Sequence, residues 1–175
     1  MANFEIRPTN DLREVAKELR TVADGKTLRK ELTGGIRDAV RPVVRLAQAA
    51  YRAIPDGPAR PSRSRAEQGD LTSLLAKATR MEVRTSGKLA GVRVRVDGRK
   101  MPSGMRSLPG LAEGEGGVDK RAGRWRHPVF GDRDTWVQQP TFPTFYRTVE
   151  PHRVWVSRAI DRVLEDVKRK IEAQR

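Results

Sequence analysis

The chain has 175 residues, a length that suits one domain, and it contains no cysteine, which excludes disulfide scaffolds and thiolate metal sites. It carries 36 Lys and Arg against 22 Asp and Glu, a net charge of +14, so nucleic acid, an anionic membrane or an acidic protein surface are the partners that its field would attract. The N-terminus lacks the apolar core of a signal peptide, and no apolar run approaches the ~20 residues of a membrane span. We therefore expect a soluble protein made in the cytoplasm, without a membrane partner.

Two helices are predicted in the N-terminal third. Apolar residues at helical spacing predict a short helix over residues 9–23 and a long one over 26–54. The long helix would bury one row of apolar residues: Leu28, Leu32, Ile36, Ala39, Val43, Leu46, Ala50 and Ile54. Gly34 and Gly35 weaken this helix by ~1 kcal/mol each relative to alanine, and Pro42 removes one backbone hydrogen bond and should kink it.

The opposite face of the long helix is basic, with Arg29, Arg37, Arg41, Arg45 and Arg52. Such a face is either solvated charge or a basic wall that faces DNA or an acidic neighbour. The linker that follows, residues 55–69, is rich in proline and arginine and is expected to be an irregular basic arm.

A β-hairpin is predicted over residues 80–97, after a short helix over 71–79. Apolar residues alternate with charged ones on both sides of a glycine-containing turn, which is typical of half-buried strands. The arginines of this hairpin form a basic outer face. Residues 98–124 are rich in glycine and poor in large apolar residues, and we expect a long flexible loop there.

The aromatic residues are concentrated between residues 123 and 156, which hold all three tryptophans, both histidines and three of the four phenylalanines. A strand is expected at 125–130, where Pro128 points to a sheet edge, within an aromatic strand or loop segment over 125–150. The last predicted element is a helix over 151–174. Its apolar stripe is Val156, Ile160, Val163, Leu164, Val167 and Ile171.

Motifs for catalysis are absent from the sequence, which contains no P-loop, no nucleophile elbow and no pair of metal ligands at helical spacing. We expect no catalytic, metal-binding or cofactor-binding residue. A small enzyme would need a pocket lined by His127, Asp132 and Asp134, yet acidic residues beside a glycine are typical turn formers.

The order of short motifs nevertheless resembles a known family. An Ala-Ile-Pro turn at 53–55 is followed by the linker, by Gly-Asp-Leu-Thr-Ser-Leu-Leu at 69–75 and by the valine hairpin. His-Pro-Val-Phe-Gly at 127–131, Trp-Val-Gln-Gln-Pro at 136–140 and the amphipathic C-terminal helix complete the series. This order resembles the neck, tail-completion or minor tail proteins of the head–tail joining region of long-tailed bacteriophages. In that family a Thr-Gly-x-Leu segment usually follows the proline turn, whereas this chain reads Gln-Gly-Asp-Leu at 68–71 after a longer linker.

The resemblance implies an α+β fold in one domain over residues 1–175. A long kinked N-terminal helix and a C-terminal helix would pack on a small antiparallel β-sheet, with long irregular loops. It also implies a structural virion protein that forms a homo-oligomeric ring, expected to be a hexamer, at the head-proximal end of the tail. Such a ring would join the tail terminator to the head-to-tail connector or stopper proteins and would surround or contact the DNA.

Two sets of residues are candidates for these contacts. The candidates for contact with DNA in the lumen are Arg60, Arg63, Arg65, Arg84, Arg93 and Arg95. The candidates for contact with other subunits or partners are Trp125, Val129, Phe130, Trp136, Phe142 and Phe145. The alternative function is that of a sequence-nonspecific nucleic-acid-binding protein, which would bind DNA or RNA tightly as a monomer.

Overall fold

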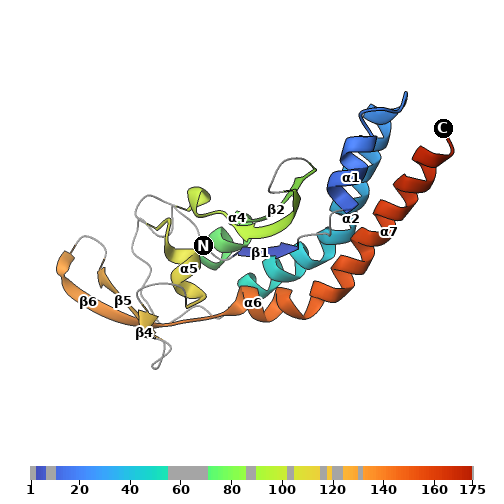
Figure 1. The fold of residues 1–175 in the computed structure, drawn as a ribbon. Coiled ribbons are helices and arrows are strands. Elements are labelled where there is room, and N and C mark those ends of the chain that lie inside the picture. The colour runs from blue at the N-terminus through green and yellow to red at the C-terminus, as the bar shows by residue number, and fades with distance from the viewer. Residues whose placement is uncertain are drawn as a thin grey trace. The chain divides into compact units, whose positions relative to one another are not determined.

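The computed structural model describes residues 3–6, 11–54, 71–85, 90–101, 105–114, 118–119, 124–129 and 132–174, and it confirms the predicted α+β fold (Figure 1). The helices are α1 (Asp11–Glu18), α2 (Gly25–Arg52), α4 (Leu71–Ala78), α5 (Leu108–Ala112), α6 (Thr144–Val149) and α7 (Arg153–Glu172), with short 3-10 turns η1 (Gly98–Lys100) and η2 (Glu150–His152). The strands are β1 (Asn3–Ile6), β2 (Thr79–Arg84), β3 (Gly91–Val96), β4 (Val118–Asp119), β5 (Arg124–Val129) and β6 (Asp132–Pro140). None of the described helices is both long and apolar enough to cross a bilayer.

The described chain divides into two compact units. Unit 1 comprises Met1–Asn3, Leu46–Arg80 and Arg95–Thr148. Unit 2 comprises Phe4–Arg45, Met81–Val94 and Val149–Arg175. Each unit is therefore assembled from segments that are distant in sequence.

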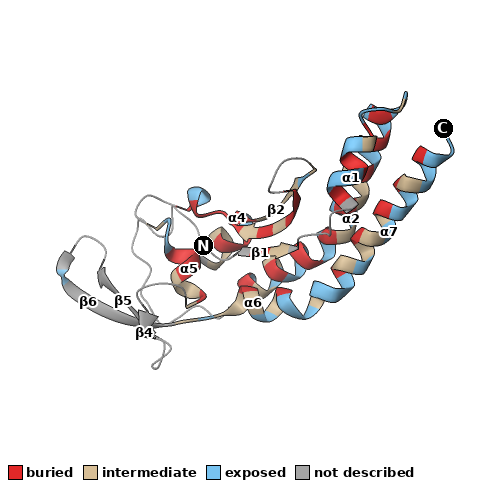
Figure 2. Ribbon diagram, in the orientation of Figure 1, coloured by how far each residue is buried: buried red, intermediate tan, exposed pale blue. Residues whose placement is uncertain are grey.

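Unit 2 is built around the apolar stripe of α7. Its buried side chains are Val156, Ile160, Leu164, Val167 and Ile171, so the predicted stripe is confirmed except at the partly exposed Val163 (Figure 2). α1 packs against α7, and its buried residues Leu12, Val15 and Ala16 lie on one helical face. Each fully buried aliphatic side chain of this kind contributes about 1.5–3 kcal/mol, so this stripe is a substantial source of stability in the unit.

α2 runs without interruption through Gly34, Gly35 and Pro42. The predicted apolar row is correct up to Ile36 and again at Val43, but it is wrong at Leu46, which is 44% exposed, and Ala39, Ala50 and Ile54 are only partly buried. The row that the structure buries continues through Val40, Val43, Val44, Ala47 and Tyr51. The buried residues recur with the 3.6-residue period of the helix. The predicted row departs from that period.

α2 and α7 approach each other closely at Gly35. A Cβ atom at this position would lie 2.8 Å from Val163 Cγ1, so a side chain cannot be accommodated without movement. One salt bridge joins the same two helices, between Lys170 Nζ and Glu31 Oε2 at 2.6 Å. A Cβ atom at the neighbouring Gly34 would have no atom within 4 Å, so only one of the two glycines is required for this packing.

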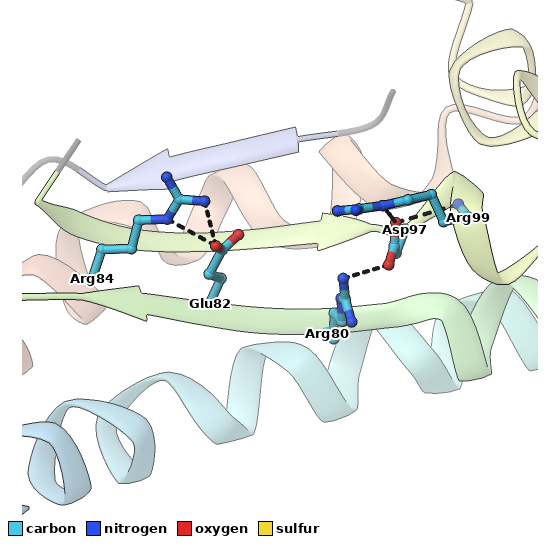
Figure 3. A network of polar contacts seen from close by, with 5 residues as sticks. All are labelled: Arg80, Glu82, Arg84, Asp97 and Arg99. Atoms are coloured by element: carbon cyan, nitrogen blue, oxygen red, sulfur yellow. Dashed lines mark hydrogen bonds and ion pairs between the residues drawn. The ribbon is translucent and has the colours of Figure 1, made fainter.

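A three-stranded sheet with the order β1-β3-β2 carries the predicted hairpin, in which neighbouring strands run antiparallel (Figure 3). The valines of β3, Val92, Val94 and Val96, are buried, as the period-two pattern predicts. β1 was not predicted. Arg153 holds it, because its Nη1 donates to the Glu5 carbonyl oxygen at 3.1 Å and its guanidinium lies 4.6 Å from the centre of the Phe4 ring.

A second three-stranded sheet in unit 1 has the order β4-β5-β6 and is antiparallel. The strand predicted at 125–130 is therefore the central strand and not an edge. Pro128 lies next to a register shift between Pro128 and Val129, and the described pairs of β4 with β5 lie away from it, at Arg124 and Trp125. The predicted Gly-rich loop at 98–124 contains η1, α5 and β4, and the aromatic segment ends in α6.

The start of α6 depends on a buried carboxylate, Glu113. Its Oε1 accepts hydrogen bonds from the Tyr51 hydroxyl at 3.0 Å and the Phe145 amide at 2.8 Å, and its Oε2 accepts one from the Tyr146 amide at 3.3 Å. The first amides of a helix lack partners within the helix, and a negative charge there is favourable. Glu113 thus ties α2 and the residues after α5 to α6 inside unit 1.

The two adjacent glycines of α2 should respond differently to alanine. Gly34→Ala should raise the free energy of unfolding by about 1 kcal/mol, because the position is helical and open. Gly35→Ala should be about 1–3 kcal/mol less stable than Gly34→Ala, because its methyl group collides with Val163. Urea denaturation of both variants measures this difference, and equal stabilities would contradict the close packing of α2 on α7.

Glu113→Ala should lower the free energy of unfolding by about 1–3 kcal/mol, because the Tyr51 hydroxyl and two helix amides lose their acceptor. Tyr51→Phe is the matched control, since it removes one hydrogen bond and keeps the carboxylate on the helix. Hydrogen exchange at the amides of Phe145 and Tyr146 should accelerate in the first variant only. Similar exchange in both variants would show that Glu113 does not cap α6.

Candidate functional site

The hairpin arginines of unit 2 are engaged by acidic side chains. Arg84 Nε donates to Glu82 Oε1 at 2.8 Å, and Arg93 lies 3.3 Å from Glu5 Oε1 on the neighbouring strand (Figure 3 shows the first pair). All four side chains line one small hollow beside the strands. The predicted basic outer face of the hairpin is thus partly neutralised within the protein.

In unit 1 the buried carboxylate of Asp97 interacts with the remaining arginines of the hairpin. Asp97, which is 2% exposed, follows β3 and forms salt bridges with Arg80 and Arg99 (Figure 3). The Arg99 amide also donates to Asp97 Oδ1 at 3.3 Å, and the Asp97 amide donates to the Ala78 carbonyl oxygen at 2.9 Å. Burial raises the pKa of Asp97, but the Arg99 amide and the charges of Arg80, Arg95 and Arg99 outweigh it, so the pKa is lowered.

The candidate DNA contacts therefore divide into three groups. Arg84 and Arg93 form salt bridges, and Arg95 is close enough to Asp97 to affect its pKa. A phosphate would have to compete with these carboxylates. Arg60, Arg63 and Arg65 lie outside the described residues.

The candidate contact residues of the aromatic segment have different environments. Phe145 is fully buried and is a packing residue, whereas Phe142 is 46% exposed. The backbones of Trp125 and Val129 belong to β5 and that of Trp136 to β6, while their side chains and Phe130 lie outside the described part of the chain. Phe142 is thus the one member of this set whose described side chain is available to a partner.

Among the described residues, no group of three or more His, Asp or Glu side chains could hold a metal ion. Asp134 is exposed on β6, and the side chains of His127 and Asp132 lie outside the described residues. The pocket that an enzyme would need from these three residues is therefore not established.

Among the described residues of unit 2, the largest exposed apolar side chains lie at the start of α7. Val154 is 60% exposed and Trp155 is 47% exposed, and both precede the buried stripe (Figure 2). Arg158 and Arg162 follow Trp155 at intervals of three and seven residues, which places them on the same helical face. This face was not predicted from the sequence, although the position of Val154 and Trp155 outside the apolar stripe is a signal that could have identified it.

A second exposed face belongs to α2. Its cations Lys26, Lys30, Arg37, Arg41 and Arg45 are all exposed. Arg29, which was expected on this face, instead directs Nη2 to the Ala16 carbonyl oxygen of α1 at 3.4 Å. The structure therefore offers two candidate surfaces in unit 2, one apolar and basic on α7 and one basic on α2.

At neutral pH, Asp97→Asn should lower the free energy of unfolding by about 1–3 kcal/mol, because buried arginine contacts lose their charged acceptor. A carboxylate with a lowered pKa stabilises the fold above its unfolded-state pKa of about 3.9 and loses that contribution as the pH falls through its folded-state value. The difference in the free energy of unfolding between wild type and variant should thus be constant above about pH 5 and shrink below pH 4. Urea denaturation between pH 2 and pH 7 tests this, and a constant difference throughout would contradict it.

Comparison of the chain with protein-family models, with curated proteins and with solved structures found no significant match. The family resemblance of the sequence motifs remains an expectation. The function is therefore inferred from the two exposed helix faces and the paired hairpin arginines.

Proposed function

We propose that this protein is a structural subunit of the neck of a long-tailed bacteriophage. Copies of the chain associate into a ring, expected to be a hexamer, at the head-proximal end of the tail. The ring joins the tail terminator to the head-to-tail connector or stopper proteins, and the DNA passes through it or ends near it. The protein would accordingly be located in the virion and would have no catalytic role.

The observation that carries this proposal is the exposed pair Val154 and Trp155 on α7. Single exposed apolar residues are common, but a tryptophan beside a valine leaves a larger apolar surface in water. Arg158 lies one helical turn away, and tryptophan and arginine are among the residues enriched at protein interfaces. This face therefore suits contact with another protein chain.

The state of the hairpin arginines supports the same proposal. Arg84 and Arg93 are bound by carboxylates of their own unit, so they are less available to phosphates than unpaired cations would be. The hairpin is therefore less suited than an unpaired basic element to hold nucleic acid. The order of the sequence motifs adds the specific location in the phage neck.

The second candidate function, a sequence-nonspecific nucleic-acid-binding protein, is favoured by one observation, the exposed cations of α2. It requires tight binding by the isolated monomer at physiological salt. The structural function requires association with other copies or with the neighbouring neck proteins, whether or not DNA is present.

The double substitution Val154→Ser and Trp155→Ser should weaken association of the subunits. Loss of a central tryptophan from an interface costs 2 kcal/mol or more, which corresponds to a dissociation constant raised about 30-fold. Light scattering and negative-stain electron microscopy of the protein, alone and mixed with neighbouring tail and head proteins, measure the effect.

Leu46→Ser is the control, because Leu46 is 44% exposed but lies on a different helix. It should assemble as the wild type does, and both variants should keep the thermal stability of the wild type. A wild-type protein that stays monomeric with its neighbours present, yet shifts duplex DNA at physiological salt, would favour the second function and contradict the first.

A further inference from the structure

One glycine in α2 has no packing role in the described structure. Gly34 is in a helical conformation, and a Cβ atom there would meet nothing within 4 Å. A glycine inside a helix costs ~1 kcal/mol relative to alanine. Gly35 offsets this cost by admitting Val163, whereas Gly34 leaves a notch on the surface of the helix.

The notch lies within a row of cations. Lys26, Lys30, Arg37, Arg41 and Arg45 follow one another at intervals of four or seven residues, so they share one face of α2. Gly34 is four residues after Lys30 and three before Arg37, and it therefore sits between them on this face. The row extends about 28 Å along the helix at 1.5 Å per residue.

The acidic residues next to this row are already paired. Glu31 binds Lys170 of α7 at 2.6 Å, and Asp38 binds Arg41 at 2.7 Å. For Lys26, Lys30, Arg37 and Arg45 the described part of the chain shows no salt bridge with an acidic residue. The face thus presents a row of positive charge in which, among the described residues, only Arg41 is paired with a carboxylate.

We propose that this face of α2, Lys26 to Arg45 with the notch at Gly34, binds the phosphate backbone of duplex DNA without reading its sequence. Arginine pairs with phosphate through two parallel hydrogen bonds, and lysine through a point charge. The notch lets a phosphate or sugar approach the helix more closely than a side chain would allow. The inference deepens the proposed function, on which it rests, by naming the element that contacts the DNA.

Duplex DNA suits this face better than an acidic protein does. DNA presents one negative charge per ~1.7 Å of its axis, so a straight row of cations can meet phosphates along its whole length. An acidic protein helix offers its charges at wider and less regular intervals and normally supplies apolar contacts as well. The described α2 face has cations and a glycine between Lys26 and Arg45 but no large exposed apolar residue.

The test is the salt dependence of binding to two unrelated 30-base-pair duplexes, measured by fluorescence anisotropy on the full chain. The triple variant Lys30→Gln, Arg37→Gln and Arg45→Gln removes three exposed cations. The slope of log Kd against log salt should fall by about 2.7, because each phosphate contact contributes about 0.9. Both duplexes should give the same result.

The control triple variant is Lys100→Gln, Arg106→Gln and Arg147→Gln, which removes the same charges from exposed positions of unit 1. It should leave the slope close to that of the wild type. Gly34→Gln should weaken DNA binding without changing the charge, whereas Gly34→Ala should weaken it less. Equal losses of slope in the two triple variants would overturn the assignment to α2.

Polyglutamate that competes as strongly as DNA at equal charge would identify an acidic protein as the partner and would also overturn the inference. The assembly of each variant is measured separately by light scattering. The α2 variants should assemble as the wild type does, so loss of DNA binding with intact assembly concerns this inference alone. Failure of the wild type to assemble would concern the proposed function instead.

Discussion

The close packing of α2 against α7 is the constraint on which the rest of unit 2 depends. Both helices use an apolar face for this contact, and the absence of a side chain at Gly35 allows Val163 to fill the space between them. The salt bridge between Glu31 and Lys170 lies on the same pair of helices. Because these inner faces are buried, the charged outer face of each helix and the Val154–Trp155 pair must meet solvent or a partner.

Salt bridges within the protein determine which of its many cations are left to bind a partner. The hairpin arginines lie close to Glu5, Glu82 and Asp97, so much of their charge is balanced where the strands meet. Beside the cations of α2, Glu31 binds Lys170 of α7 and Asp38 binds Arg41, and the other cations of the row have no salt bridge among the described residues. A net charge of +14 therefore does not act evenly over the surface, and the exposed cations of α2 are the ones for which we propose a polyanion partner.

The elements that could be predicted from the sequence are those with a local period. α7 shows a 3.6-residue repeat of apolar residues, and the valines of β3 alternate, so both were predicted close to their observed positions. β1 and α6 were missed because their stability comes from distant residues. Arg153 holds β1 through the Glu5 carbonyl and the Phe4 ring, and Glu113 holds the first amides of α6.

The sequence by itself determined the two long amphipathic helices, the valine hairpin and the positive charge, because periodicity and composition are local properties. Only the tertiary structure decided which arginines are paired, that Phe145 is buried while Trp155 is exposed, and that Gly35 is needed for packing while Gly34 is not. Spacing along the chain shows which residues share a face of a helix or strand. It does not show which neighbour covers that face, because this depends on contacts between segments that are far apart in sequence.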